Sequence, residues 1–159
     1  DQLHARAKGP VVMAKTLIVG SDHAGLDLKR ELSGVAAELG YEVVDLGTHT
    51  SDSTDYPDYA HQVATAVASG DGLGLLVCGT GIGMSMTANR HPGVRAALCG
   101  DVFSASMTRR HNDANILCVG ARVVGAGLAR EILRAFLGAS FEGGRHERRV
   151  NKIDLTNAG

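Results

Sequence analysis

The chain has 159 residues, of which 44% are hydrophobic and 21% are charged, so it is long enough for one globular domain with a full hydrophobic core. The formal net charge of -1 and the aromatic content of 4%, without any Trp, argue against a surface made for nucleic acid or for an anionic membrane. No apolar run approaches the roughly 20 residues that a membrane-spanning helix needs.

Residues 1–12 lack the apolar stretch of a signal peptide, and Met13 resembles a natural start. We expect residues 1–12 to be an upstream extension or a cloning remnant. Residues 13–159 contain no internal repeat, low-complexity segment or linker, and we expect them to form a single domain.

Short apolar runs that end in glycine or polar residues alternate with segments of helical periodicity. The runs predict strands at residues 16–20, 42–47, 73–78, 94–99 and 115–120. The periodic segments predict helices at residues 26–39, 56–69, 84–89, 102–110, 127–137 and 145–153. Continuously apolar strands that alternate with helices are typical of a parallel sheet covered on both faces. We therefore expect an α/β fold, as a single three-layer α/β/α domain of Rossmann-like type with a five-stranded parallel sheet.

Ligands of such sheets bind beyond the carboxyl ends of the strands, and the third strand ends in a glycine-rich loop. Gly79, Gly81 and Gly83 alternate between a strand and a helix, where backbone N–H groups can converge on a phosphate or an oxyanion. The spacing fits neither the dinucleotide fingerprint, because residue 84 is Met, nor a Walker A loop, because no Gly-Lys-Ser/Thr follows. A tight turn that simply requires glycine is the alternative interpretation.

Cys78 is the last residue of the third strand and lies directly beside this loop. Cys99 and Cys118 lie within apolar runs, and we expect them to be buried thiols. Three cysteines without a CxxC pair argue against a disulfide framework, and reduced thiols are typical of a cytoplasmic protein. A base beside an oxyanion site is what proton abstraction next to a carbonyl requires, so Cys78 is the candidate base, with a buried small hydrophobe as the alternative.

Polar residues near other strand ends extend the candidate site. His111 suits proton transfer at neutral pH, as the opening of a cyclic sugar would need, although a lone histidine is about as often a surface residue. His23 could bind a phosphate or hydroxyl groups. Arg145 and Arg149 are four residues apart and suit a phosphate, with a solvated basic face as the alternative. His23, His111 and Asp113 form no spaced ligand cluster, so no metal site is expected.

A series of motifs follows in order from about residue 13 to about residue 153. They are Gly20-Ser-Asp-His-Ala-Gly25, Thr54-Asp-Tyr-Pro57, Cys78-Gly-Thr-Gly-Ile-Gly-Met84, Ala88-Asn-Arg90, Arg110-His-Asn-Asp113, Gly120-Ala-Arg-Val-Val124 and Gly143-Gly-Arg-His-Glu-Arg-Arg149. In this combination, which covers nearly the whole chain, the sequence resembles the type B ribose-5-phosphate isomerases. That family also includes the subunits of galactose-6-phosphate isomerase.

The resemblance implies an aldose–ketose isomerase of the pentose phosphate pathway, which interconverts D-ribose 5-phosphate and D-ribulose 5-phosphate through an enediolate without metal or organic cofactor. Cys78 would move the proton between C2 and C1, and His111 would assist ring opening. Thr80 would help to position the sugar. Backbone N–H groups along residues 79–83, Ile82 included, would hold the enediolate.

The resemblance also implies a set of substrate-binding residues, of which the basic ones mainly hold the phosphate: Asp22, His23, Asn112, Arg122, Arg145 and Arg149. Tyr56 would line the pocket. Some members of the family carry a Glu base where this chain has Met84, so this chain is similar to the cysteine type. Members form dimers, often dimers of dimers, and a neighbouring subunit completes each site. Such sharing would explain how C-terminal arginines reach a distant strand end.

Alternative functions remain open. The substrate could be another sugar phosphate, such as a tetrose, allose or galactose phosphate. A non-catalytic sugar-phosphate sensor on the same fold is disfavoured because both Cys78 and His111 are present, and a nicotinamide-dependent dehydrogenase is disfavoured by the absent fingerprint. The expected partners are a phosphorylated sugar and further copies of the chain, in a homodimer or homotetramer, and neither nucleic acid nor a membrane.

Overall fold

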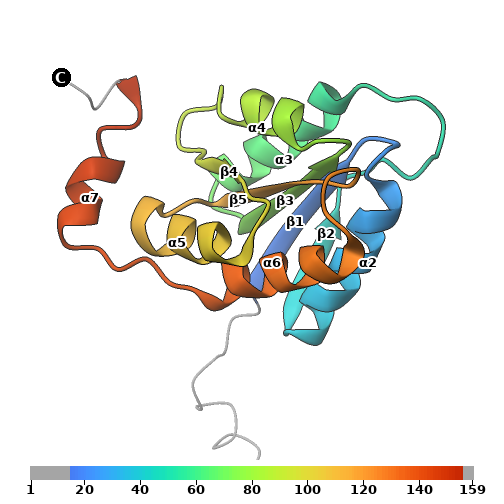
Figure 1. Cartoon of the computed structure of the whole chain (residues 1–159). Helices are drawn as coiled ribbons and strands as arrows, with labels where there is room; N and C mark the ends of the chain where they lie inside the picture. Colours follow the sequence, from blue (N-terminus) through green and yellow to red (C-terminus); the bar gives the residue numbers. More distant parts are fainter. Residues whose placement is uncertain (1–14, 156–159) are drawn as a thin grey trace, which may run out of the picture.

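The computed structural model describes residues 15–155, and the extension expected at residues 1–12 lies outside this range (Figure 1). Within these residues, five strands form one parallel sheet in the order β2-β1-β3-β5-β4. The strands are β1 (Lys15–Ser21), β2 (Tyr41–Asp45), β3 (Leu73–Cys78), β4 (Ala96–Leu98) and β5 (Ile116–Gly120). The helices are α2 (Leu26–Glu38), α3 (Tyr56–Ala68), α4 (Ile82–Ala88), α5 (Val102–Asn112), α6 (Ala126–Gly138) and α7 (Arg145–Val150).

The hydrophobic core has two halves, one on each face of the sheet. Leu17 and Val19 of β1 pack with helices α2 and α6, while Ile18 between them packs with α3 and α4 on the other face. Figure 1 shows α3 and α4 on one side of the sheet and α2, α5 and α6 on the other. Apolar side chains on both faces of the central strands explain why the sequence runs are continuously apolar, and the predicted three-layer α/β fold is confirmed.

The two edge strands differ most from their sequence predictions. The run at residues 94–99 forms only the three-residue strand β4, and three of the five residues of β2 are exposed. An edge strand has one neighbour and fewer ladder hydrogen bonds, so pairing ends sooner than the apolar run does. The helix predicted at residues 145–153 ends at Val150 and continues as turns. In the part of the chain that is described, no helix is long and apolar enough to cross a bilayer.

The strand order reverses between β1 and β3. The chain leaves β1 toward one edge, where β2 lies, and after β3 it builds the sheet toward the other edge. Such a reversal opens a crevice at the carboxyl ends of the two central strands, which is where ligands of α/β sheets bind. Ser21 at the end of β1 is paired with Val77 near the end of β3, so the segments that follow both strands leave the sheet side by side.

A fully buried lysine fixes the chain at the end of β2. The Lys29 side chain on α2 is 0% exposed, and its ammonium donates to Asp45 Oδ1 at 2.7 Å and to the Thr48 carbonyl oxygen at 2.6 Å. The same Asp45 oxygen accepts the Gly47 N–H at 2.9 Å. A buried ammonium must be paired with a negative charge, and here the pairing fastens the loop after β2 onto helix α2.

Replacement of Asp45 by alanine would leave the Lys29 ammonium buried beside the Thr48 carbonyl alone. We expect Asp45→Ala to lower the free energy of unfolding by about 3 kcal/mol, because loss of the carboxylate leaves the buried ammonium without a charged partner. Urea unfolding followed by circular dichroism measures this change. The control is Asp71→Ala, since Asp71 is exposed and its side chain makes no ion pair within residues 15–155. Equal stability of the two variants would contradict the role given to Lys29.

Candidate active site

The turn after β1 lies directly against β3. The Asp22 N–H donates to the Val77 carbonyl oxygen at 3.3 Å, and Asp22 Oδ1 accepts the Gly25 N–H at 3.1 Å. A Cβ atom on Gly25 would lie 2.4 Å from that same Val77 oxygen, so only glycine allows the turn to approach β3 this closely. The buried Asp22 carboxylate is thereby held next to the strand that ends in Cys78.

His23 is oriented by the loop that follows β2. The backbone N–H of His23 donates to Thr54 Oγ1 at 3.0 Å, and the Thr54 N–H donates to His23 Nδ1 at 3.1 Å. Since Nδ1 accepts this hydrogen bond, the proton of the neutral imidazole belongs on Nε2. His23 therefore has its Nε2–H available as a donor for a ligand.

Cys78 ends β3 with its sulfur inside the glycine-rich loop. Its side chain is 5% exposed, and Sγ accepts the Gly81 N–H at 3.1 Å. Gly81 has φ of 77°, and a Cβ there would lie 2.6 Å from the Leu98 side chain, so glycine is required at this position. A donor aimed at the sulfur stabilises negative charge on it. Thr80 Oγ1 accepts the Ile82 N–H at 3.3 Å and shapes the next turn of the loop.

Arg122 and Tyr56 border this loop. The Arg122 N–H donates to the Gly79 carbonyl oxygen at 2.9 Å, and the Arg122 side chain runs along Gly79. A Cβ on Gly83 would lie 2.5 Å from the Tyr56 ring, so that ring covers the loop closely. The structure therefore brings one group of the predicted site residues together at the carboxyl edge of the sheet: Asp22, His23, Tyr56, Cys78, Gly79, Thr80, Gly81, Ile82, Gly83 and Arg122.

The other predicted residues lie at the opposite end of the strands, beside their amino ends. His111 and Asn112 end helix α5, which precedes β5, and in a parallel sheet that position is at the amino ends of the strands. A five-residue strand separates its two ends by roughly 15 Å. Figure 1 shows α7, which carries Arg145 and Arg149, beside α5 and away from the loop after β3. Within one chain, these four residues therefore do not meet Cys78.

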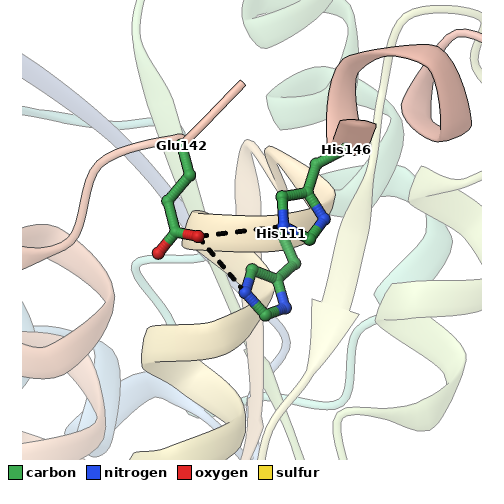
Figure 2. Close-up of side chains that lie close together, drawn as sticks. All are labelled: His111, Glu142 and His146. Atoms are coloured by element: carbon green, nitrogen blue, oxygen red, sulfur yellow. Dashed lines mark ion pairs between the residues drawn. The ribbon is translucent and has the colours of Figure 1, made fainter. Parts of the chain in front are cut away.

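His111 lies in a cluster that sequence reasoning missed. Figure 2 shows Glu142 and His146 beside it, with Glu142 Oε1 3.4 Å from His111 Nε2 and 3.8 Å from His146 Nε2. The two imidazole rings stack, with centroids 4.1 Å apart and planes 10° from parallel. A hollow of about 340 Å³ beside them is lined by His111, Asn112, His146, Arg149, Val150 and Ile153. In the sequence, only the four-residue spacing of Glu142 and His146 indicates that these two side chains could lie close together. That spacing does not identify His111 as their neighbour.

The three side chains could be considered as metal ligands, because their nearest N and O atoms all lie within 4.8 Å of one another. Two features disfavour this use. The lone pairs of an imidazole lie in its ring plane, and two stacked, nearly parallel planes do not meet at one ion, whereas zinc ligands surround the metal tetrahedrally. Arg110 Nε donates to Glu142 Oε2 at 2.7 Å, so the carboxylate charge is already paired.

Electrostatics within the cluster follow from these contacts. The hydrogen bond from Arg110, together with the charges of Arg110, His111 and His146, lowers the pKa of Glu142 below its usual value. Burial, followed by the neighbouring His111 and Arg145, lowers the pKa of His146. At neutral pH the cluster therefore contains an ionised Glu142 and a neutral His146.

The sequence and the fold match known proteins over nearly the whole chain. Residues 17–153 match the family described as Ribose/Galactose Isomerase. The ribose-5-phosphate isomerase B of Escherichia coli is 52% identical over 141 residues, which cover 87% of this chain and 94% of that protein.

Solved structures agree. That of Clostridium thermocellum ribose-5-phosphate isomerase B has a TM-score of 0.87 at 50% identity and covers 90% of this chain and 97% of that one. That of the Mycoplasma genitalium isomerase B with bound ribulose-5-phosphate has a TM-score of 0.87 at 42% identity, covering 92% and 98%. With these similarities over nearly its whole length, the chain belongs to the ribose/galactose isomerase family.

Proposed function

We propose that this chain is an aldose–ketose isomerase that interconverts D-ribose 5-phosphate and D-ribulose 5-phosphate. The observation that carries the proposal is the position of Cys78 Sγ, which lies in the glycine-rich loop at the point where the strand order reverses. Relatives named ribose-5-phosphate isomerase B, one of them solved with ribulose-5-phosphate, support the choice of substrate.

The reaction is a proton transfer within one sugar. The Cys78 thiolate removes the proton from C2 of the open-chain aldose. The electron pair of that C–H bond forms the C1=C2 double bond, and the π electrons of the C1 carbonyl move to O1 to give an enediolate. After a proton passes between O2 and O1, the thiol returns its proton to C1 and the ketose forms. Donors of the loop at residues 79–83 stabilise the charge on the oxygens, and Thr80 helps to position the sugar. Electrons balance within the substrate, so the reaction needs no external oxidant or reductant.

Cys78 differs from the other two cysteines in its surroundings. Burial raises the pKa of Cys99 to about 11, with the Asp101 carboxylate adding to the shift, and burial also raises the pKa of Cys118. Both thiols therefore stay protonated at neutral pH and pack in the core. All three cysteines are free, which fits a reducing compartment, and we expect the enzyme to act in the cytoplasm.

We further propose that the active site is shared between two subunits of a homodimer. The carboxyl edge of one subunit would supply Cys78 and its loop, and the amino edge of the partner would supply its His111, Asn112, Arg145 and Arg149. In the roles proposed here these residues act on the sugar, yet within residues 15–155 of one chain they lie at the opposite end of the strands from Cys78.

Exposed apolar side chains support this assembly. Several large hydrophobic side chains are exposed at the carboxyl ends of the strands or on the helices that begin there: Ile82, Met86, Leu98, Val102, Phe103 and Val123. Phe103 alone is 74% exposed. An apolar surface beside a functional loop is typical of a subunit interface. In the shared site, His23 Nε2–H and Arg122 of one subunit would meet Arg145 and Arg149 of the partner around the phosphate.

The family description names galactose as well as ribose, so the length of the sugar is tested separately. Initial rates for ribose 5-phosphate, allose 6-phosphate, galactose 6-phosphate and erythrose 4-phosphate are compared at equal concentrations. We expect the highest kcat/KM for ribose 5-phosphate. A higher value for another aldose phosphate would keep the isomerase mechanism and change the substrate.

Removal of the base tests the mechanism. We expect Cys78→Ala to lower kcat for ribose 5-phosphate by about 10³-fold, because a general base typically contributes that much. The matched control is Cys99→Ala, which removes a buried thiol outside the site and should keep kcat within about twofold. Far-UV circular dichroism checks that both variants fold. Substantial turnover by folded Cys78→Ala would refute the role of the thiol.

Mixing of two inactive variants tests the shared site. Cys78→Ala and His111→Ala subunits, unfolded and refolded together in equal amounts, form half of their dimers as mixed pairs, and each mixed pair has one intact site. We expect recovery of about one quarter of the wild-type activity, from a symmetric dimer with sites built across the interface. Mixed samples that stay inactive while native mass spectrometry shows mixed dimers would rule out this arrangement.

Thiol labelling tests the difference among the cysteines. During a short exposure of the native protein to iodoacetamide at pH 7, we expect mass spectrometry to find label at Cys78 and none at Cys99 or Cys118, whose thiols stay protonated. Saturating ribose 5-phosphate should slow the labelling of Cys78 by at least about tenfold. Equal labelling of Cys118 and Cys78 would contradict the assignment.

A further inference from the structure

Glu142 is fixed at the end of helix α5 from two sides. Its backbone N–H donates to the Arg110 carbonyl oxygen at 3.0 Å, and its Oε2 accepts from Arg110 Nε at 2.7 Å. Both contacts join the segment before α7 to the last turn of α5, next to His111. With one oxygen held by Arg110, the other oxygen, Oε1, faces the two imidazoles (Figure 2).

Both imidazoles line the hollow beside the cluster, and His111 is the more exposed of the two. Its side chain is 33% exposed and lies beside the hollow that Asn112 and Arg149 also line, whereas the His146 side chain is 10% exposed. His146 stacks flat on His111 and limits the rotation of that ring. The lowered pKa of His146 keeps it neutral, so it does not compete as an imidazolium for the carboxylate.

We propose that Glu142 is a positioning residue for His111 in ring opening, a role that rests on the function proposed above. The negative Oε1 beside Nε2 places the proton of the neutral His111 ring on Nε2 and leaves the lone pair of Nδ1 free to accept a proton. The same carboxylate stabilises the imidazolium that forms when Nδ1 accepts that proton. Arg110 holds the carboxylate in place, as a third group holds the base in other acid–base pairs.

In the ring-opening step, His111 alone carries the proton from one oxygen of the sugar to the other. Nδ1 takes the proton of the C1 hydroxyl of the furanose, the C1=O double bond forms, and the bond between C1 and the ring oxygen breaks. The imidazolium then gives its proton to that ring oxygen, which becomes the C4 hydroxyl. Glu142 remains a carboxylate throughout, and the product is the open-chain aldose that Cys78 of the other subunit acts on.

The reactions of two substrates distinguish an effect on ring opening from an effect on isomerisation. Ribose 5-phosphate is a closed ring and needs both steps. Ribulose 5-phosphate is open-chain, because phosphate blocks its C5 hydroxyl, so exchange of its C1 proton with D₂O needs only the Cys78 step. The exchange is followed by proton NMR, and the turnover of ribose 5-phosphate is followed in parallel.

We expect Glu142→Gln to lower kcat for ribose 5-phosphate by about tenfold or more, part of the 10²–10⁴-fold effect of a general acid–base group. Deuterium exchange into ribulose 5-phosphate should stay within about twofold of wild type. Glu142→Asp, which keeps the charge, should recover part of the turnover. The matched control is Glu147→Gln on α7, an exposed carboxylate that should leave both rates unchanged.

Equal losses in turnover and exchange would overturn the proposal, because they would mean that Glu142 supports the site as a whole. Unchanged turnover by Glu142→Gln would also overturn it. If instead the function proposed above were wrong, the Cys78→Ala variant would retain deuterium exchange. His111→Ala supplies the reference, since it should lose turnover of ribose 5-phosphate and retain exchange.

Discussion

The common direction of the five strands is the constraint on which the proposed site depends. In a parallel sheet all carboxyl ends lie at one edge, so every segment that follows a strand lies there, and every segment that precedes a strand lies at the opposite edge. Cys78 follows the first rule and His111 the second. Within residues 15–155 the length of the strands therefore separates the thiol from the imidazole, and the dimer proposed above would join them by means of a second chain.

Close backbone approach is the second requirement of the site. Gly25 brings the turn after β1 against Val77, and Gly120 at the end of β5 leaves room for the backbone of Thr80, 2.6 Å from where its Cβ would be. Neither contact provides chemistry by itself. Together they allow the segments after β1, β3 and β5 to pack against one another, and this packing brings Asp22, Cys78 and Arg122 to the same end of the sheet.

The sequence predicted most of the fold, because apolar runs and helical periodicity report on burial, and burial decides these elements. It overestimated β4, since an apolar run does not show that a strand lies at an edge. Motifs found Cys78 and the glycine loop, whose residues are adjacent along the chain. They did not find Glu142, because its partners Arg110 and His111 are about 30 residues away and meet it only through the packing of the segment before α7 against α5.

The separation of the two groups of residues has a consequence for gene duplication. If each site takes its thiol from one chain and its imidazole from the other, then two diverged copies could each lose one of these groups and still form one working site per pair. Such a pair would depend on co-expression, since neither copy alone would be active. In that case, the parallel sheet that separates the two groups would allow each chain of a pair to supply one of them.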